Sequence, residues 1–107
     1  MRIVVGLGLM AALCATAASA RPAKLTDVAY MQAARCAGLA DSGKFSGADA
    51  ASLTALLKDQ SQGRMDYVLQ KADDLRRDAK RQADRADDYM KAKLSAEVSG
   101  PCAQIKG

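Results

Sequence analysis

The sequence predicts an all-α protein, a small three-helix bundle that carries one disulfide and follows a cleaved signal peptide. Three observations support this fold class. Hydrophobic residues recur at every third or fourth position along much of the chain, which is the period of an amphipathic helix. Alternating runs of Val, Ile and Thr, which are typical of strands, do not occur in the sequence. Downstream of the signal, Cys36 and Cys102 form a pair that an oxidising compartment can bridge.

Residues 1–20 have the parts of a secretory signal peptide. Arg2 supplies a positive n-region, a short apolar stretch follows, and a small-residue cleavage site ends at Ala20. The apolar stretch is too short for a membrane-spanning helix, which needs about 20 apolar residues. Cleavage leaves one helical domain, residues 21–107. We therefore expect an exported protein, periplasmic or extracellular, and the Ala-rich signal is typical of bacteria.

Cys14 raises an alternative, which is bacterial lipid attachment. A lipidation site normally has a small residue immediately before the cysteine, whereas Leu13 stands there. This favours signal cleavage, which removes Cys14 from the mature chain. Cleavage also removes one basic residue and leaves a mild net charge of +3.

The first predicted helix spans about residues 27–40, with Thr26 as its N-cap. Its apolar side on a helical wheel comprises Leu25, Val28, Ala29, Cys36, Leu39 and Ala40. Cys36 thus faces the core, which suits a disulfide. In the chain-entropy model a bridge from Cys36 to Cys102 stabilises the fold by about 4 kcal/mol. For so small a domain this can decide whether the chain folds.

A linker at residues 41–47 follows, and its Gly, Ser and Asp residues are turn formers. The second helix is predicted over about 47–62, with a capping box that starts at Ser46 and places Asp49 at N3. Gly63 is predicted to end it in the left-handed conformation. The residues predicted to point inward are Leu53, Leu56 and Leu57.

The third helix is predicted over about 64–96, a stretch that contains neither Gly nor Pro. Apolar residues with the spacing of a bundle or coiled coil run along it and form a candidate interaction stripe: Met65, Val68, Ala72, Leu75, Ala79, Ala86 and Tyr89. Leu69, Ala83, Met90 and Leu94 fall in the same arc of the wheel. Burying so many alanines removes little apolar surface from water, so the sequence predicts a thin core.

The predicted lengths pose a topological problem. Up-down-up topology places Cys36 and Cys102 at the same end of the bundle, but the third helix is about twice as long as the second and should overshoot. Three solutions remain open: the tail at 97–102 folds back, the third helix bends, or the bridge joins two molecules. A continuous rod over residues 47–96 would be about 75 Å long and would separate the cysteines.

Residues 71–93 carry 8 basic and 6 acidic side chains, with the signs mixed. Opposite charges recur one helical turn apart, as in Asp73 with Arg77 and Lys80 with Asp84. The carboxylates would repel phosphates, and no aromatic residues are interleaved for base stacking, so we expect no nucleic-acid partner. A membrane-surface helix needs large apolar residues, which the Ala-rich stripe does not provide. We interpret the charged face as solvent-facing.

Two motifs and the composition bear on chemistry. Residues 38–44 match G-x-x-x-x-G-K, but Phe45 replaces the Ser or Thr of a P-loop and a predicted helix precedes the motif. The linker resembles part of an EF-hand loop but lacks its alternating acidic ligands and closing Glu. The chain has no His, the commonest general base and metal ligand. We expect no enzymatic activity, no cofactor and no metal.

The sequence favours an exported structural or protein-interaction module of the cell envelope or periplasm. It would bind a protein partner, or itself, through the candidate interaction stripe. In size, helicity and cysteine pair the chain is similar to bacterial periplasmic acid-stress chaperones, although it shares no motif with them. That resemblance implies an alternative function, a stress chaperone that exposes apolar surface when it is destabilised.

Overall fold

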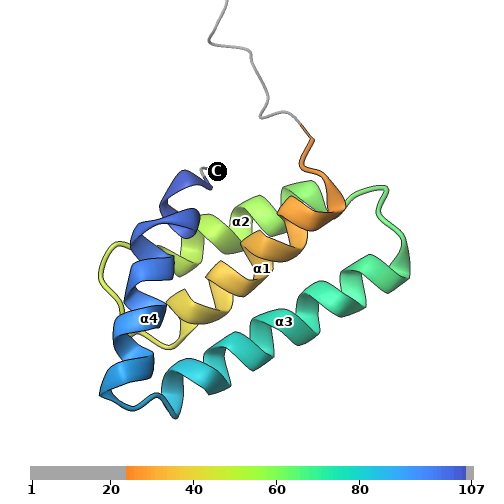
Figure 1. Ribbon diagram of the computed structural model, residues 1–107. Helices are drawn as coiled ribbons and strands as arrows, with labels where there is room; N and C mark the ends of the chain where they lie inside the picture. Colours follow the sequence, from red (N-terminus) through yellow and green to blue (C-terminus); the bar gives the residue numbers. More distant parts are fainter. Residues whose placement is uncertain (1–23, 106–107) are drawn as a thin grey trace, which may run out of the picture.

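The computed structural model describes residues 24–105. Within this range the fold consists of four α-helices and a short 3-10 helix, without strands (Figure 1). The helices are α1 (Asp27–Asp41), α2 (Ala50–Gln60), α3 (Asp66–Asp84) and α4 (Asp88–Ser99), followed by η2 (Pro101–Gln104). The all-α prediction is confirmed. The predicted signal peptide, with Cys14, lies outside the described residues.

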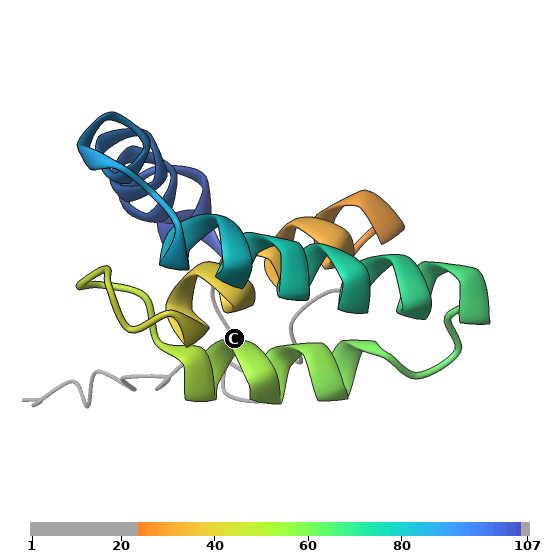
Figure 2. The same cartoon turned by 90° about the horizontal axis from the view of Figure 1, so that it is seen from below.

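Helix α1 is the central element of the fold (Figures 1 and 2). α1, α2 and α3 run up, down and up, and α1 packs against both of the others. By contrast, no Cα atom of α2 lies within 8 Å of a Cα atom of α3. Helices α2 and α3 therefore depend on α1 for their relative position.

The contact between α1 and α3 is made by small residues. Gly38 of α1 and Ala72, Ala79 and Ala83 of α3 are all buried. Gly38 marks the closest approach, since a Cβ atom built there would lie 2.1 Å from the carbonyl oxygen of Arg76 and 2.8 Å from the Cβ of Ala79. The small side chains bury little surface, but they allow backbone-to-side-chain packing at close range.

A buried arginine joins the start of α1 to the end of α2. The side chain of Arg64 is 3% exposed. Its Nη1 donates to Asp27 at 2.7 Å, its Nη2 to the carbonyl of Leu25 at 2.6 Å and its Nε to the carbonyl of Gln60 at 2.7 Å. The guanidinium also lies 4.4 Å from the ring centroid of Tyr30. These contacts compensate the burial of the charge.

The prediction of a single helix over residues 64–96 is wrong. The helix ends at Asp84, and α4 turns back toward the end of α1 (Figure 1). The disulfide explains why: Cys36 and Cys102 are joined within one chain, with Cα atoms 5.6 Å apart. A straight helix over 64–96 would extend about 50 Å and carry the chain past Cys36. Of the three possible solutions, the bend is the one adopted.

Side chains satisfy the backbone groups that this break frees. Lys44 donates from Nζ to the carbonyl oxygens of Ala83, at 3.3 Å, and Asp84, at 3.0 Å, which caps the end of α3. Asp87 accepts from the N–H of Met90 at 2.8 Å, which caps the start of α4. The break therefore needs neither Gly nor Pro.

Helix α2 also begins differently from the prediction. Asp49 is the N-cap itself, not the N3 residue of a box that starts at Ser46, and its carboxylate accepts from the N–H of Ser52 at 3.3 Å. The helix therefore starts at Ala50. Gly47 has a φ of 91° and keeps the preceding chain out of helical geometry. As predicted, Leu53, Leu56 and Leu57 are buried.

Val28 is 74% exposed, contrary to the prediction that it faces the core. It lies seven residues before Arg35 and so on the same side of α1. Arg35 pairs with Glu97 of α4 at 2.6 Å, but α4 covers only the later part of α1 (Figure 1). Val28 is left without a neighbouring helix. Cys36, Leu39 and Ala40 are buried as predicted.

Replacing Gly38 with Ala is expected to destabilise the fold by roughly 1–3 kcal/mol, because the new methyl group meets the backbone of α3. Helix propensity alone predicts the opposite, a gain of about 1 kcal/mol. Urea unfolding followed by far-UV circular dichroism measures the difference. The control is Ala92→Gly on the exposed face of α4, which should lose about 1 kcal/mol from propensity. A Gly38→Ala variant as stable as the wild type would contradict the close packing.

Candidate binding groove

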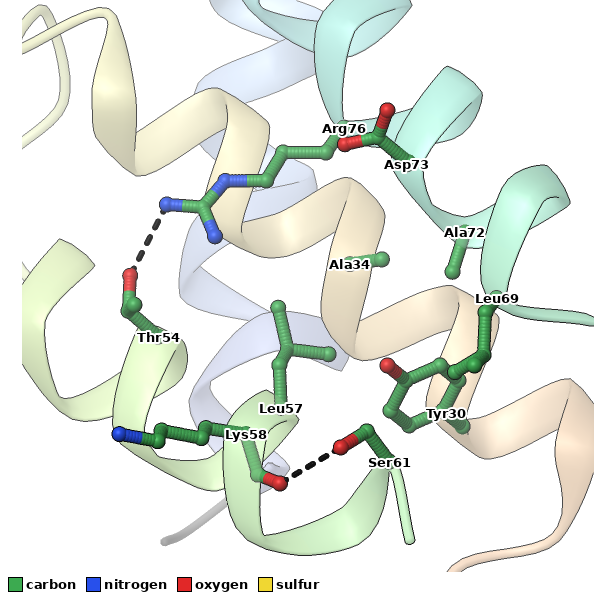
Figure 3. A pocket seen from close by; sticks show the side chains of 10 residues that line it. All are labelled: Tyr30, Ala34, Thr54, Leu57, Lys58, Ser61, Leu69, Ala72, Asp73 and Arg76. Carbon is green, nitrogen blue, oxygen red and sulfur yellow. Dashed lines mark hydrogen bonds between the residues drawn. The ribbon is translucent and has the colours of Figure 1, made fainter. Parts of the chain in front are cut away.

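In the ribbon view α2 and α3 stand apart, and α1 packs against both (Figure 2). Side chains of these three helices line a groove of about 300 Å³ (Figure 3). This volume lies at the lower end of the range for small-ligand sites, about 300–1,000 Å³. All three helices line it: Tyr30 and Ala34 from α1, Thr54, Leu57 and Lys58 from α2 with Ser61 just beyond it, and Leu69, Ala72, Asp73 and Arg76 from α3.

The base of the groove is apolar. The ring of Tyr30 and the side chains of Ala34 and Ala72 belong to the buried core, and Leu57 and Leu69 stand at the two sides (Figure 3). Because Ala34 and Ala72 are small, they leave the space between α2 and α3 unfilled. Ala72 thus contributes both to the close packing of α1 against α3 and to the open space of the groove.

Arg76 closes one end of the groove. Its Nη2 donates to the hydroxyl of Thr54 at 2.9 Å, which links α3 to α2 (Figure 3). Its Nε and Nη2 also bind Asp41 of α1, at 2.7 and 2.9 Å. The hydrogen bond to Asp41 raises the pKa of Arg76 above its ordinary value, so the guanidinium stays charged. At the other end, the chain at 61–65 connects the two helices, with Arg64 against Tyr30.

Three hydrogen-bond donors along the groove have no acceptor among the described residues. Among the described residues, none accepts a hydrogen bond from the hydroxyl of Tyr30, Nη1 of Arg76 or Nζ of Lys58. Lys58 has no acidic partner in this part of the chain, whereas Asp73 is paired with Arg77 at 2.7 Å. The groove therefore combines an apolar base with a donor-rich, net positive rim.

The fold divides the candidate interaction stripe. Val68, Ala72 and Ala79 are buried, and Leu75 and Ala86 are half-buried. Met65 and Tyr89 are 74% and 70% exposed. Tyr89 belongs to α4, beyond the break, so the stripe is not one continuous surface. Ala72 is its member that lines the groove.

The motifs considered from the sequence have structural roles here. Lys44, the lysine of the G-x-x-x-x-G-K match, caps α3, and Gly38 lies within α1, so these residues do not form a phosphate-binding loop. Residues 24–105 contain no group of three or more His, Cys, Asp or Glu side chains arranged to hold a metal ion. In the same range, no helix is long and apolar enough to cross a membrane.

Tyr30, Thr54, Lys58 and Arg76 were not identified from the sequence, because they come from three different helices. One signal was present for Arg76. On a helical wheel it falls between Leu69 and Ala72, inside the apolar arc of α3. A charged residue within such an arc indicates a buried partner or a functional contact.

Comparison with known proteins finds no match for this chain. No family model, no curated protein and no solved structure is similar to it. The function of the groove therefore has to be argued from its own residues, their contacts and their charges.

Proposed function

We propose that this chain is an exported protein-interaction module and that the groove between α2 and α3 binds an apolar group of a partner protein. The observation that carries the proposal is the groove itself, an apolar concavity bordered by a few polar side chains. Binding sites in proteins commonly combine these two features. Arg76 joins α3 to Asp41 of α1 and to Thr54 of α2, and Arg64 joins the end of α2 to the start of α1, so the groove is preformed.

Binding is favoured over catalysis by the groups that line the groove. The sequence contains no His, and the groove offers no nucleophile with an adjacent base. Its aliphatic hydroxyls, on Thr54 and Ser61, already donate to backbone carbonyls at 2.7 Å. Arg76 is engaged with Asp41 and Thr54. These groups can recognise a ligand, but they do not form an acid-base pair.

Export is supported by the disulfide and by the sequence of residues 1–20. Disulfides form and persist mainly in oxidising compartments such as the periplasm or the extracellular space. Cys36 is fully buried and Cys102 is 7% exposed, so the bridge is shielded from reductants. A structural role in the cell envelope is compatible with the same location.

A photo-reactive amino acid introduced at Lys58, on the rim of the groove, should crosslink to one protein of defined mass in the cells that export this chain. The matched control places the same residue at Lys91, on the exposed face of α4. The proposal expects the adduct at position 58 and not at position 91. No adduct at 58, or the same adduct at both positions, would argue against the groove as the docking site.

Intact mass spectrometry tests export and the internal bridge together. The mature protein is expected to begin at Arg21 and to weigh two hydrogens less than the fully reduced chain, because Cys36 and Cys102 are bridged. Treatment with reductant should restore those two hydrogens. A chain that retains residues 1–20, or a dimer that reductant separates, would contradict this expectation.

A stress chaperone is the second candidate function, and one observation favours it. Three ion pairs attach other parts of the fold to α1, and each depends on a carboxylate: Arg35–Glu97, Arg64–Asp27 and Arg76–Asp41. Acid protonates carboxylates and would weaken these attachments. With so thin a core, their loss could expose apolar surface to unfolded proteins.

Two carboxylates outside these ion pairs, Asp49 and Asp84, have pKa values that the fold lowers. The hydrogen bond from Lys80 lowers the pKa of Asp84, and hydrogen bonds from the side chain and backbone of Ser52 lower that of Asp49. Both carboxylates stabilise the fold when charged, so their contribution is present above the ordinary pKa, about 3.9, and is lost only as the pH falls through the lowered values. Asp49 and Asp84 should stay charged between neutral pH and about 5. We therefore expect neither of them to change the circular dichroism or the hydrophobic-dye fluorescence in this range.

Asp49→Asn is the matched variant, because Asn keeps the N-cap and removes the charge. Its stability should change less with pH below about 4 than that of the wild type. Dye fluorescence that rises between neutral pH and about 5 would instead favour the chaperone function.

A further inference from the structure

We infer that the groove is built for the carboxyl-terminal residue of a partner chain, an apolar side chain next to a free carboxylate. This inference rests on the proposed function, that the groove binds a protein. It adds the chemical identity of the bound group.

The first argument is charge complementarity. Three polar groups along the groove, the hydroxyl of Tyr30, Nη1 of Arg76 and Nζ of Lys58, are free to donate hydrogen bonds, and two of them are positively charged. The hydroxyl of Tyr30 and Nη1 of Arg76 point toward the middle of the groove, whereas Nζ of Lys58 lies on the rim, away from both, and adds its charge there (Figure 3). A carboxylate is a pure acceptor that can take several such bonds. The acidic residue on the rim, Asp73, is paired with Arg77 at 2.7 Å, which reduces its repulsion of an incoming anion.

The second argument is the shape of the groove. The hydrogen bond from Arg76 to Thr54 crosses it at one end, and the connection at 61–65 crosses it at the other. Both crossings obstruct a continuous peptide strand that would run along the length of the groove. A chain terminus can enter from above, and about 300 Å³ accommodates one large side chain with its carboxylate.

The third argument is the apolar base. Tyr30, Leu57 and Leu69 offer carbon surface to an aliphatic or aromatic side chain (Figure 3). Burial of that side chain would exclude water from the neighbouring donors and strengthen their bonds to the carboxylate. An apolar residue that lacks a carboxylate, or a carboxylate without the apolar group, would use only half of the site.

The test uses N-acetylated hexapeptides of Gly and Ser that end in Leu, Val, Met or Phe, each prepared as a free acid and as a C-terminal amide. The disulfide-bonded mature protein is titrated with each peptide and followed by two-dimensional NMR of its backbone amides. We expect at least one acid to bind about tenfold or more tightly than its amide, because charge-assisted hydrogen bonds are lost in the amide. The shifted signals should belong to residues around Tyr30, Leu57 and Leu69.

Two conservative variants identify the groups that bind the carboxylate. Lys58→Gln removes the charge, and Tyr30→Phe removes the hydroxyl but keeps the ring that packs against Arg64. Each should weaken the binding of the acid several-fold and leave the binding of the amide unchanged. Lys91→Gln, which removes the same charge from the exposed face of α4, should change neither. Their circular dichroism spectra establish that the variants remain folded.

The outcomes separate the two proposals. Acids and amides that bind the groove equally well would overturn the inference and leave the proposed function in place. Failure of every peptide to shift the groove signals would overturn both. N-acetyl-leucine that binds as tightly as the hexapeptides would show that a small apolar carboxylate is the occupant, which would overturn the assignment to a partner chain.

Discussion

The close packing of α1 against α3 at Gly38 is the constraint on which the rest of the structure depends. The backbone of α3 occupies the place where a side chain at position 38 would lie, so no other residue fits there without movement of a helix. Helix α1 in turn holds the remaining elements: α2 packs on one side, Arg35 binds Glu97 of α4, and Cys36 is bonded to η2. A shift between α1 and α3 would therefore move α3 relative to all the elements that α1 holds.

This arrangement has two consequences. Alanines bury little apolar surface, so the core contributes modestly, and the disulfide, with a long loop between its cysteines, supplies about 4 kcal/mol in the chain-entropy model. The same small residues, Ala34 and Ala72, leave the space between α2 and α3 open. Small side chains between the helices thus account both for the modest core and for the open groove.

The charges of α3 serve two distinct purposes. Most of its basic residues pair within the helix and face solvent: Arg77 with Asp73, Lys80 with Asp84 and Arg81 with Asp78. Such exposed pairs contribute little to stability. Arg76 differs, because it crosses to Asp41 and Thr54 and joins three helices at the end of the groove. Arg76 is therefore a structural residue on a helix whose other charges mostly face solvent, and it also lines the candidate groove.

The sequence by itself determined the all-α class, the two cysteines available for a bridge and the inward leucines of α2, because helical spacing and residue type are local properties. It left open whether the bridge joins one chain or two, and the tertiary structure decided that it lies within one chain. Only the tertiary structure decided where the long helical segment breaks. The carbonyls freed at Ala83 and Asp84 are capped by Lys44, which comes from a linker distant in the sequence. Helical periodicity cannot predict such a contact. Asp87 carried a local signal as an N-cap, but apolar spacing on both sides of it concealed the break. The groove likewise could not be predicted from the sequence. It arises from the distance between α2 and α3, and this distance is set by the packing of both helices on α1.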